Sequence, residues 1–588
     1  MKKTLLLTSL TISAFVFTSA AVVAAPFINQ ASSTVSKPTE VKRGGSFADG
    51  SFGSFETFNP LYSRVSGDIP RRLGAYTGLF TLDAEKREYV PYLAESYTLS
   101  PDKRVWTFKL RPEAKWSDGK PLIADDFVLS TKINQDEDME SQYYDEFFQN
   151  DKPVITQKVD DRTVRVTFAK ATVDTIESLP FPLPAHVFAP AYAKGKKALQ
   201  DLWNLKTDPA SVVTLGPWVL RSFREGERIV FVKSPTFGEW NKDSAGGALP
   251  YIDGYTVELF KDGNAEFAAF LSGKLDSFTP RNANDLAQIK AAVDGGNLKA
   301  VLRPNISSGQ TGDRIAWNWN RASDPRKQKL FRDPVFRRAM SHLMNRSAMV
   351  QLALNGTGSP MYDYVPPLFK LFQSPNLAKF DYDPEQASKL LSQIGFRKKN
   401  ADGILIDSAG KTLEFDLSPN AGNNRRAALS QIFADEAKKI GVKVNVRPVD
   451  TGTWSAYLGG GDKSNDRKFD AVMYGITGGG VILPFSAAVL DCRTGSLVAY
   501  NQSGKCIQPW ETTVNNLFAK SQLEFDNKKR QQLVFQIQDT ISREQPIVYL
   551  VSPNYHAAWS SKLKGEYPSS IADAYIEERD ITLVWINQ

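Results

Sequence analysis

The sequence is poor in the side chains that most often carry out chemistry. It contains three histidines, His186, His342 and His556, and two cysteines among 588 residues. None of the histidines lies in a nucleophile or metal motif such as G-x-S-x-G or H-E-x-x-H. Neither glycine-rich stretch, 459–461 or 478–480, is immediately followed by Lys-Ser or Lys-Thr, since Asp462 precedes Lys463-Ser464, so neither is a phosphate-binding loop. We therefore expect no catalytic site, no metal site and no cofactor.

Blocks of positive charge and long apolar runs are also scarce. The formal net charge is +7, or +5 without Lys2 and Lys3 of the N-terminal segment. The densest basic run, KKR at 528–530, is typical of a solvated helix face, so nucleic acid is not expected as a partner. The 42% hydrophobic and 23% charged residues are typical of a soluble globular protein. A length of 588 residues predicts two or three domains.

The N-terminus carries the features of a secretory leader. Lys2-Lys3 is followed by an apolar core from Leu5 to Phe17 and then by small residues. This order predicts a signal peptide over 1–24, cleaved after Ala24, and a disordered polar segment over 25–43. A membrane anchor is the alternative, but the apolar core is short and is interrupted by Thr and Ser. Because no cysteine lies near the cleavage site to carry a lipid, we expect a soluble periplasmic protein.

The two cysteines, Cys492 and Cys506, are predicted to form a disulfide. An even number of cysteines in an exported protein favours pairing. The bond would close a loop of roughly 15 residues, which the chain-entropy model values at about 3 kcal/mol. Two buried thiols remain an alternative. A metal pair is a poor one, because no histidine lies nearby.

The stretch from Leu93 to Thr131 predicts strand, turn, strand, turn and helix. Residues 105–110 alternate between apolar and polar side chains, as in a half-buried strand. The turn before them, at 100–102, contains proline and aspartate. Asp125 and Asp126 fall in the first turn of the expected helix, where carboxylates are favourable.

This stretch, LAESYTLSPDKRVWTFKLRPEAKWSDGKPLIADDFVLS, resembles the signature of the family 5 extracellular solute-binding proteins of ABC importers. That group includes oligopeptide- and dipeptide-binding proteins. Further matches, such as FRDPVFRRAMSHLMNRSAMVQLALNG and DYDPEQASKLLSQIGF, recur in order from about Gly44 to Val551. One departure is Ile123, where the family usually has a threonine that caps the helix. We therefore expect this helix end to be frayed.

The resemblance implies an α/β fold: the two-lobed periplasmic binding protein fold, type II and of the large three-domain variety. Its sheets would be mixed, with a hinge between the lobes. The first lobe would comprise 44–80, 206–305 and 536–588, with 81–205 as an additional domain attached to it. The second lobe would comprise 306–535.

The implied function is capture of a peptide or peptide-like solute and its delivery to a membrane permease. The protein would act as a monomer, by binding and lobe closure, with no chemistry. Two alternatives stay open. The same fold could bind another solute, such as a glycan, an opine or a metal complex. A secreted hydrolase is the alternative from a different class.

Four ligand contacts are implied by position within the family. Asp68 would face the ligand, Trp454 would form a pocket wall, and Arg425 would reach a ligand end. Trp317 would lie near the crossing between the lobes. Each has a structural alternative: a helix cap for Asp68, a solvated helix start for Arg425, and core packing for the two tryptophans.

The family's peptide binders also place an aspartate after a strand that here reads FDAVMYG, to hold the peptide's amino group. This chain has glycines at 478–480 there, with Gly479 in the middle, and no acid until Asp491. A buried ammonium without a counter-charge is costly. Either Asp68 or Asp491 replaces the missing acid, or the ligand is not held by a free amine.

The leader generates the first testable prediction. The mature protein should begin near Ala25 and be found in the soluble periplasmic fraction. N-terminal sequencing of the purified protein measures this directly. An intact Met1 on the mature chain would contradict it.

Overall fold

The computed structural model describes residues 22–23, 41–52, 55, 57–63, 69–83, 88–149, 152–308, 311–365, 372–458, 466–477, 482–493, 498–565 and 581–587. Most of the predicted leader and polar segment, 1–43, lies outside these ranges. Val22–Val23 forms strand β1, which pairs with Ser96 and Tyr97. Cleavage after Ala24 would remove this strand. Within the described residues, no helix combines the length and the hydropathy needed to cross a membrane.

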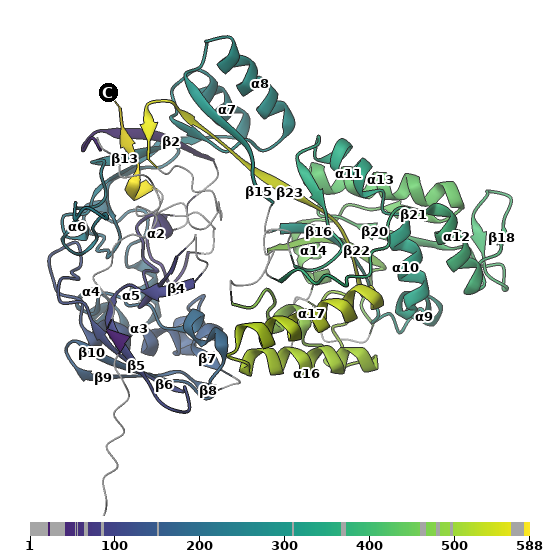
Figure 1. The fold of residues 1–588 in the computed structure, drawn as a ribbon, viewed down its shortest axis with the longest axis horizontal. Coiled ribbons are helices and arrows are strands. Elements are labelled where there is room, and N and C mark those ends of the chain that lie inside the picture. The colour runs from purple at the N-terminus through teal and green to yellow at the C-terminus, as the bar shows by residue number, and fades with distance from the viewer. Residues whose placement is uncertain are drawn as a thin grey trace, which may run out of the picture.

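The protein consists of two α/β lobes, and the chain crosses between them more than once (Figure 1). The N-terminal half of the chain and the last strands lie on one side, and the green segments from β16 (Thr311–Trp317) to α17 (Asn527–Glu544) lie on the other. Strands β15 (Ala300–Ser308) and β23 (Ile547–Ser560) lie between them. The two-lobed fold expected from the sequence is confirmed.

The first lobe is built on a four-stranded mixed sheet. Its order is β11 (Trp218–Arg224), β12 (Arg228–Lys233), β13 (Gly254–Phe260) and β2 (Ser46–Phe52). Only the β13–β2 pair is parallel. The helices on this side are α2 (Ile69–Arg72), α6 (Phe237–Trp240), α7 (Gly263–Leu271) and α8 (Ala283–Asp294).

Residues 81–205, the segment that the sequence predicts as an attached domain, contain the predicted hairpin. Strands β5 (Ala94–Leu99) and β6 (Val105–Leu110) pair antiparallel, and β10 (Thr163–Thr167) and β9 (Ile155–Asp160) extend the sheet. The alternation in β6 buries Phe108 and Leu110 completely. The helices of this segment are α3 (Ala124–Asn134), the 3₁₀ helix η3 (Val173–Ser178), α4 (Ala185–Tyr192) and α5 (Lys196–Asp201).

The start of α3 is well bonded, so the expected fraying is wrong. The carboxylate of Asp126 accepts hydrogen bonds from the backbone N–H of Ile123 at 3.0 Å and of Ala185 at 2.8 Å. It also accepts one from Trp116 Nε1 at 3.0 Å. Asp126 is buried, and that burial raises the pKa of its carboxyl group. A first-turn acid thus replaces the missing threonine.

The second lobe is organised around the larger sheet, whose order is β14, β23, β16, β22, β20 and β21. The strands not yet bounded are β14 (Ser277–Phe278), β22 (Ala471–Thr477), β20 (Glu414–Ser418), β21 (Lys443–Val446) and β17 (Gly358–Pro360), which pairs with β23. The helices are α9 (Pro325–Arg332), α10 (Pro334–His342), α11 (Arg346–Ala353), α12 (Pro384–Gln393), α13 (Asn424–Ile440), α14 (Thr451–Leu458), α15 (Ala487–Leu490), α16 (Pro509–Leu523) and α17.

The described residues also contain four two-stranded sheets. They are β3 (Phe80–Asp83) with β4 (Glu88–Pro91), β7 (Phe148–Gln149) with β8 (Lys152–Pro153), β18 (Lys398–Lys399) with β19 (Leu405–Ile406), and β24 (Leu563–Lys564) with β25 (Trp585–Ile586).

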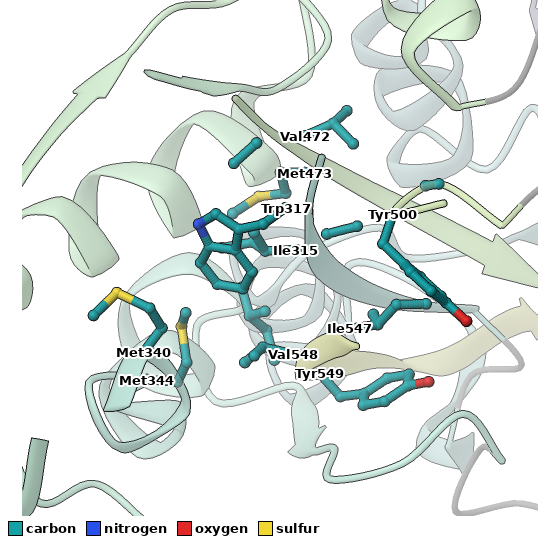
Figure 2. Close-up of a cluster of buried hydrophobic side chains, with 14 of the residues drawn as sticks. Ile315, Trp317, Met340, Met344, Val472, Met473, Tyr500, Ile547, Val548 and Tyr549 are labelled. Carbon is teal, nitrogen blue, oxygen red and sulfur yellow. The ribbon is translucent and has the colours of Figure 1, made fainter. Parts of the chain in front are cut away.

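The core of the second lobe extends further along the chain than expected. Figure 2 shows Trp317 of β16 among Met340, Met344 and Val548. The same core takes in apolar residues of α17 and the first half of β23, up to Val551. The sequence predicts a return to the first lobe at 536. The buried apolar residues of 537–551 pack in the second-lobe core.

The predicted disulfide between Cys492 and Cys506 is confirmed. The Sγ–Sγ distance is 1.98 Å and the two Cα atoms are 5.1 Å apart. Asn515 Nδ2 lies 3.2 Å from Cys492 Sγ. By the loop-entropy argument, the bond raises the free energy of unfolding by about 3 kcal/mol.

The pairing of β15 with β23 contains an irregularity fastened by a histidine. The register shifts between Arg303 and Ser307, and Asn305 there has a left-handed φ of 55°. The backbone N–H of Asn305 donates to His556 Nδ1 at 2.9 Å. An N–H can only donate, so Nδ1 must be unprotonated and the ring neutral. Burial lowers the pKa of His556, which favours the same neutral form.

This bond predicts a pH dependence. The folded-state pKa of His556 lies below its unfolded value of about 6.5. The stability contributed by the neutral ring is therefore present above that value and is lost as the pH falls through the folded-state pKa. His556→Asn keeps an acceptor without a titrating ring. Its urea unfolding free energy should fall less than that of the wild type from about pH 7 to pH 5. Parallel curves for the two proteins would contradict the prediction.

Candidate ligand-binding site

Two strands of the second lobe, β16 and β22, meet at one edge of its sheet. β16 starts there at Thr311, and β22 ends beside it at Thr477. β20 runs parallel to β22 but ends earlier, at Ser418, which is paired with Val472 near the start of β22. This edge follows directly from the crossing strand β15. In α/β lobes, the carboxyl ends of strands are where ligands are usually bound.

A buried carboxylate at this edge is shared by two arginines. Asp313 of β16 is fully buried and accepts from Arg425 Nε at 2.8 Å and Arg426 Nε at 3.0 Å. Both arginines lie in the first turn of α13, where Asn423 caps the helix by accepting from the Arg426 N–H at 3.0 Å. The Arg425 side chain is 32% exposed and that of Arg426 only 9%. The cluster of one acid and two bases carries a net positive charge, which Arg425 presents to solvent.

Trp454 lies against the same cluster. It is half-buried in α14, and its Nε1 donates to the carbonyl of Met473 in β22 at 2.9 Å. The guanidinium of Arg426 lies over its ring, 5.1 Å from the centroid. One edge of Trp454 therefore packs on the second-lobe core while its face supports a cation. The structure thus brings Trp454 and Arg425 together through Arg426.

An arginine enclosed by tyrosines lies next along β16. The guanidinium carbon of Arg314 is 4.9, 5.2 and 5.8 Å from the ring centroids of Tyr364, Tyr549 and Tyr474. Beside Tyr364, the fully buried Asp363 has its pKa raised to about 6 by burial. Sequence reasoning missed this group. The signal that could have found it is a charged Asp-Arg pair in the middle of an otherwise apolar strand.

The other predicted site residues lie elsewhere. Trp317 is fully buried at the far end of β16, edge-on to Phe336 at 5.7 Å and Phe415 at 6.0 Å. This is the core position that the sequence left open as its alternative (Figure 2). Asp491 accepts from Asn515 Nδ2 at 2.7 Å, next to the disulfide. Asp68 and Gly479 lie outside the described residues.

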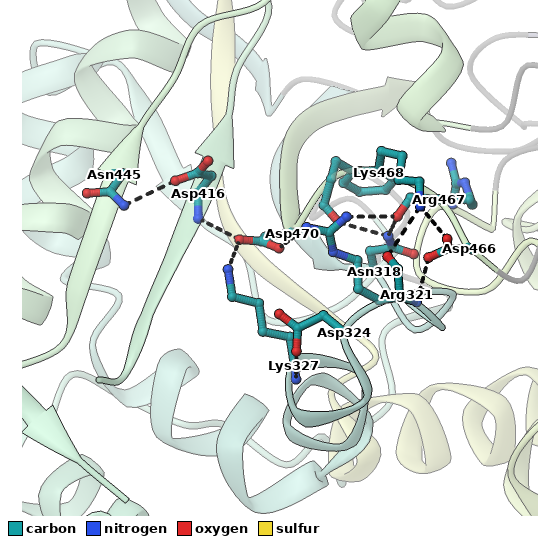
Figure 3. Close-up of polar contacts among 12 residues, drawn as sticks. Asn318, Arg321, Asp324, Lys327, Asp416, Asn445, Asp466, Arg467, Lys468 and Asp470 are labelled. Atoms are coloured by element: carbon teal, nitrogen blue, oxygen red, sulfur yellow. Dashed lines mark hydrogen bonds and ion pairs between the residues drawn. The ribbon is translucent and has the colours of Figure 1, made fainter. Parts of the chain in front are cut away.

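A second polar cluster occupies the opposite end of the sheet (Figure 3). Asp470 accepts from Lys327 Nζ at 2.5 Å and from the Asp416 N–H at 3.1 Å, and it forms an ion pair with Arg321 at 3.3 Å. Because Lys327 lies in α9, this cluster fastens that helix to β20 and β22. The Asp470 carboxylate is 4% exposed and already has two cationic partners, so it is a poor ligand-binding group. Among the described residues, no group of three or more His, Cys, Asp or Glu is placed to hold a metal ion.

Comparison with known proteins decides the family. Residues 88–487 match the model of the bacterial extracellular solute-binding proteins, family 5 Middle. A probable ABC transporter-binding protein of Deinococcus radiodurans is 42% identical over 579 residues, covering 96% of this chain and 97% of that protein. The chain belongs to family 5 of the bacterial extracellular solute-binding proteins. The family predicted from the sequence is thereby confirmed, as is the role of a solute-binding component of an ABC transporter.

More distant relatives extend this picture. The oligopeptide-binding protein AppA of Bacillus subtilis is 25% identical over 563 residues, covering 94% of this chain and 96% of AppA. Its structure in complex with a nonapeptide superposes with a TM-score of 0.68, at 23% identity, over 93% of this chain and 100% of that one. MelB of Agrobacterium fabrum C58, in complex with stachyose, has the same TM-score at 20% identity, over 93% of this chain and 85% of MelB. At these identities the structural likeness shows the fold.

The shared carboxylate generates a stability prediction. Asp313→Asn would leave two arginines without their counter-charge in a buried site. It should lower the free energy of unfolding by about 3–5 kcal/mol, measured by guanidinium denaturation.

The matched control is Asp416→Asn. The Asp416 carboxylate pairs with Arg447 at 2.9 Å on an exposed part of the same lobe. This variant should change the unfolding free energy by about 1 kcal/mol or less. Equal losses of unfolding free energy in the two variants would contradict the prediction, because they would show that burial of the Asp313 ion pairs adds nothing to stability.

Proposed function

We propose that the protein captures a peptide or peptide-like solute between its lobes and delivers it to the permease of an ABC importer. The observation that carries the proposal is the cationic, tryptophan-backed corner formed by Asp313, Arg425, Arg426 and Trp454. It lies at the strand edge where such lobes bind ligands. The naming of AppA as an oligopeptide-binding protein supports a peptide as the ligand.

The corner suits the chemistry of a peptide end. Arg425 is anchored to Asp313 through Nε at 2.8 Å and Nη2 at 3.4 Å, which leaves Nη1 to donate to a carboxylate. The aromatic surface of Trp454 provides apolar contact area beside it. The peptide backbone would be held extended by strand-like hydrogen bonds. Either Asp68 or Asp491 is proposed as the counter-charge for a ligand amine, in place of the family's acid near Gly479.

We infer that the protein is exported by the leader over 1–24 and acts as a periplasmic monomer. We propose residues 44–80, 206–305 and the C-terminal tail as its first lobe, with 81–205 attached. The packing of α17 and of the first half of β23 supports a return to that lobe within β23. Binding without chemical change is the activity proposed. Stoichiometric capture without turnover would separate it from a secreted hydrolase.

A non-peptide solute is the second candidate. The glycines at 478–480, in place of the family's acid, favour a ligand without a free amine. MelB, whose solved complex contains stachyose, has the same fold. Native mass spectrometry of ligand that co-purifies with the protein distinguishes the two, because it measures the mass of the bound species.

The binding prediction concerns Arg425. Arg425→Ala should weaken ligand binding roughly tenfold or more, because a charge-assisted hydrogen bond is worth about 1.5–3 kcal/mol. Folding should be affected less than by Asp313→Asn, since Arg426 still pairs with the carboxylate. Titration calorimetry with the identified ligand measures the effect. Arg447→Ala, which removes an exposed arginine of the same lobe, is the control and should bind as the wild type does.

Unchanged affinity in Arg425→Ala would contradict the assignment of this corner. Product release from a peptide mixture incubated with the pure protein would contradict the proposed binding role.

A further inference from the structure

Two elements of the attached domain contact the turn between α16 and α17 of the second lobe. In the β5–β6 turn, Lys103 Nζ lies 3.5 Å from the centroid of the Phe525 ring. In η3, Asp174 Oδ2 accepts from Gln522 Nε2 at 3.4 Å, and Val173 packs against the second-lobe core. In Figure 1 the α16–α17 pair reaches the attached domain at a distance from the crossing strands β15 and β23. The attached domain and the second lobe are therefore in contact at a second place, away from the crossing strands β15 and β23.

The attached-domain side of this contact is held rigidly. Lys103 has a left-handed φ of 59°, and its N–H donates to the Ser100 carbonyl at 2.8 Å. Ser100 Oγ accepts from the Val105 N–H at 2.9 Å, which closes the turn a second time. The backbone position of Lys103 is thus fixed by the turn, which belongs to the family's signature stretch.

The second-lobe side is equally ordered. Arg530 of α17 donates to the Glu524 carbonyl at 3.0 Å and to Asn527 Oδ1 at 2.6 Å, so it holds the turn that carries Phe525. The same arginine interacts favourably with the charge of Asp174 across the contact. Because Val534, Ile537 and Ile541 of α17 are buried in the second-lobe core, the turn moves with that lobe.

We propose that this contact is a latch: the β5–β6 turn and η3 clasp the α16–α17 turn and hold the lobes together opposite the crossing strands. Rotation of the lobes about β15 and β23 separates Lys103 from Phe525 and Asp174 from Gln522. The latch therefore stabilises the closed form without contacting ligand. A ligand that binds the closed form gains apparent affinity in proportion to the closed fraction. This consequence rests on the proposed function, whereas the effect on shape does not.

The test uses Lys103→Ala, Phe525→Ala and the double variant of the full chain. Small-angle X-ray scattering of the ligand-free proteins should give a larger radius of gyration for each single variant than for the wild type. The double variant should open no further than the more open single variant, because both remove the same contact. Where the ligand is known, its dissociation constant should rise roughly threefold to tenfold. Lys109→Ala is the matched control, since Lys109 lies in the same hairpin, is 58% exposed and pairs with Glu95 inside the domain.

Scattering curves of the latch variants that match those of the wild type and Lys109→Ala would overturn the latch, whatever the ligand is. Additive opening in the double variant would show that the two side chains act separately and would also overturn it. Opening of the latch variants together with failure to bind any peptide would leave the latch standing and contradict the proposed ligand instead.

Discussion

β23 pairs with β16 over residues 547–551 and with β15 over residues 554–560, so one continuous strand belongs to both lobes. A regular ladder of backbone hydrogen bonds resists bending and shear. Relative movement of the lobes is absorbed most readily where the ladder is irregular: at the register shift between Asp313 and Arg314, and at the one between Arg303 and Ser307. The neutral ring of His556 fastens the latter point from the opposite strand. Stability and closure are thereby linked to one short stretch of paired backbone.

The entry into β23 is anchored by buried cations. Arg337 donates to the carbonyls of Glu544 and Gln545, each at 2.8 Å, where α17 ends. Arg346 donates to the carbonyl of Tyr549, inside the strand, at 2.9 Å. Burial lowers the pKa of both guanidinium groups to about 10, so they remain charged at neutral pH. Positive charge at the C-terminal end of a helix is favourable. Here the arginines also fix the direction in which the chain leaves α17 and enters β23.

Elements whose signals are local could be predicted from the sequence. The hairpin at 93–110 follows from alternation and turn chemistry, and the family motifs then identified the fold. Assignments that depend on distant packing could not be predicted in this way. The pattern of α17 does not indicate which lobe covers it, so the sequence predicts the boundary at 536. At the site, Arg425 was found through its family position, but Asp313 was not. Its partner lies 112 residues away along the chain, and this leaves no local pattern.

The position of the cationic corner limits what it can do alone. Asp313, Arg425 and Trp454 all belong to the second lobe, so a ligand bound only to them has the same contacts whether the lobes are open or closed. A ligand shifts a conformational equilibrium only by its difference in affinity between the two states. Capture at this corner therefore has to be followed by contacts from the first lobe, or closure gains nothing from the ligand. An intrinsic bias toward closure, as from contacts between the lobes, lowers the number of ligand contacts needed. Such a bias also raises the fraction of protein that is closed without ligand. The ratio of closed protein with ligand to closed protein without it then decides how well a permease can distinguish the loaded form from the empty one.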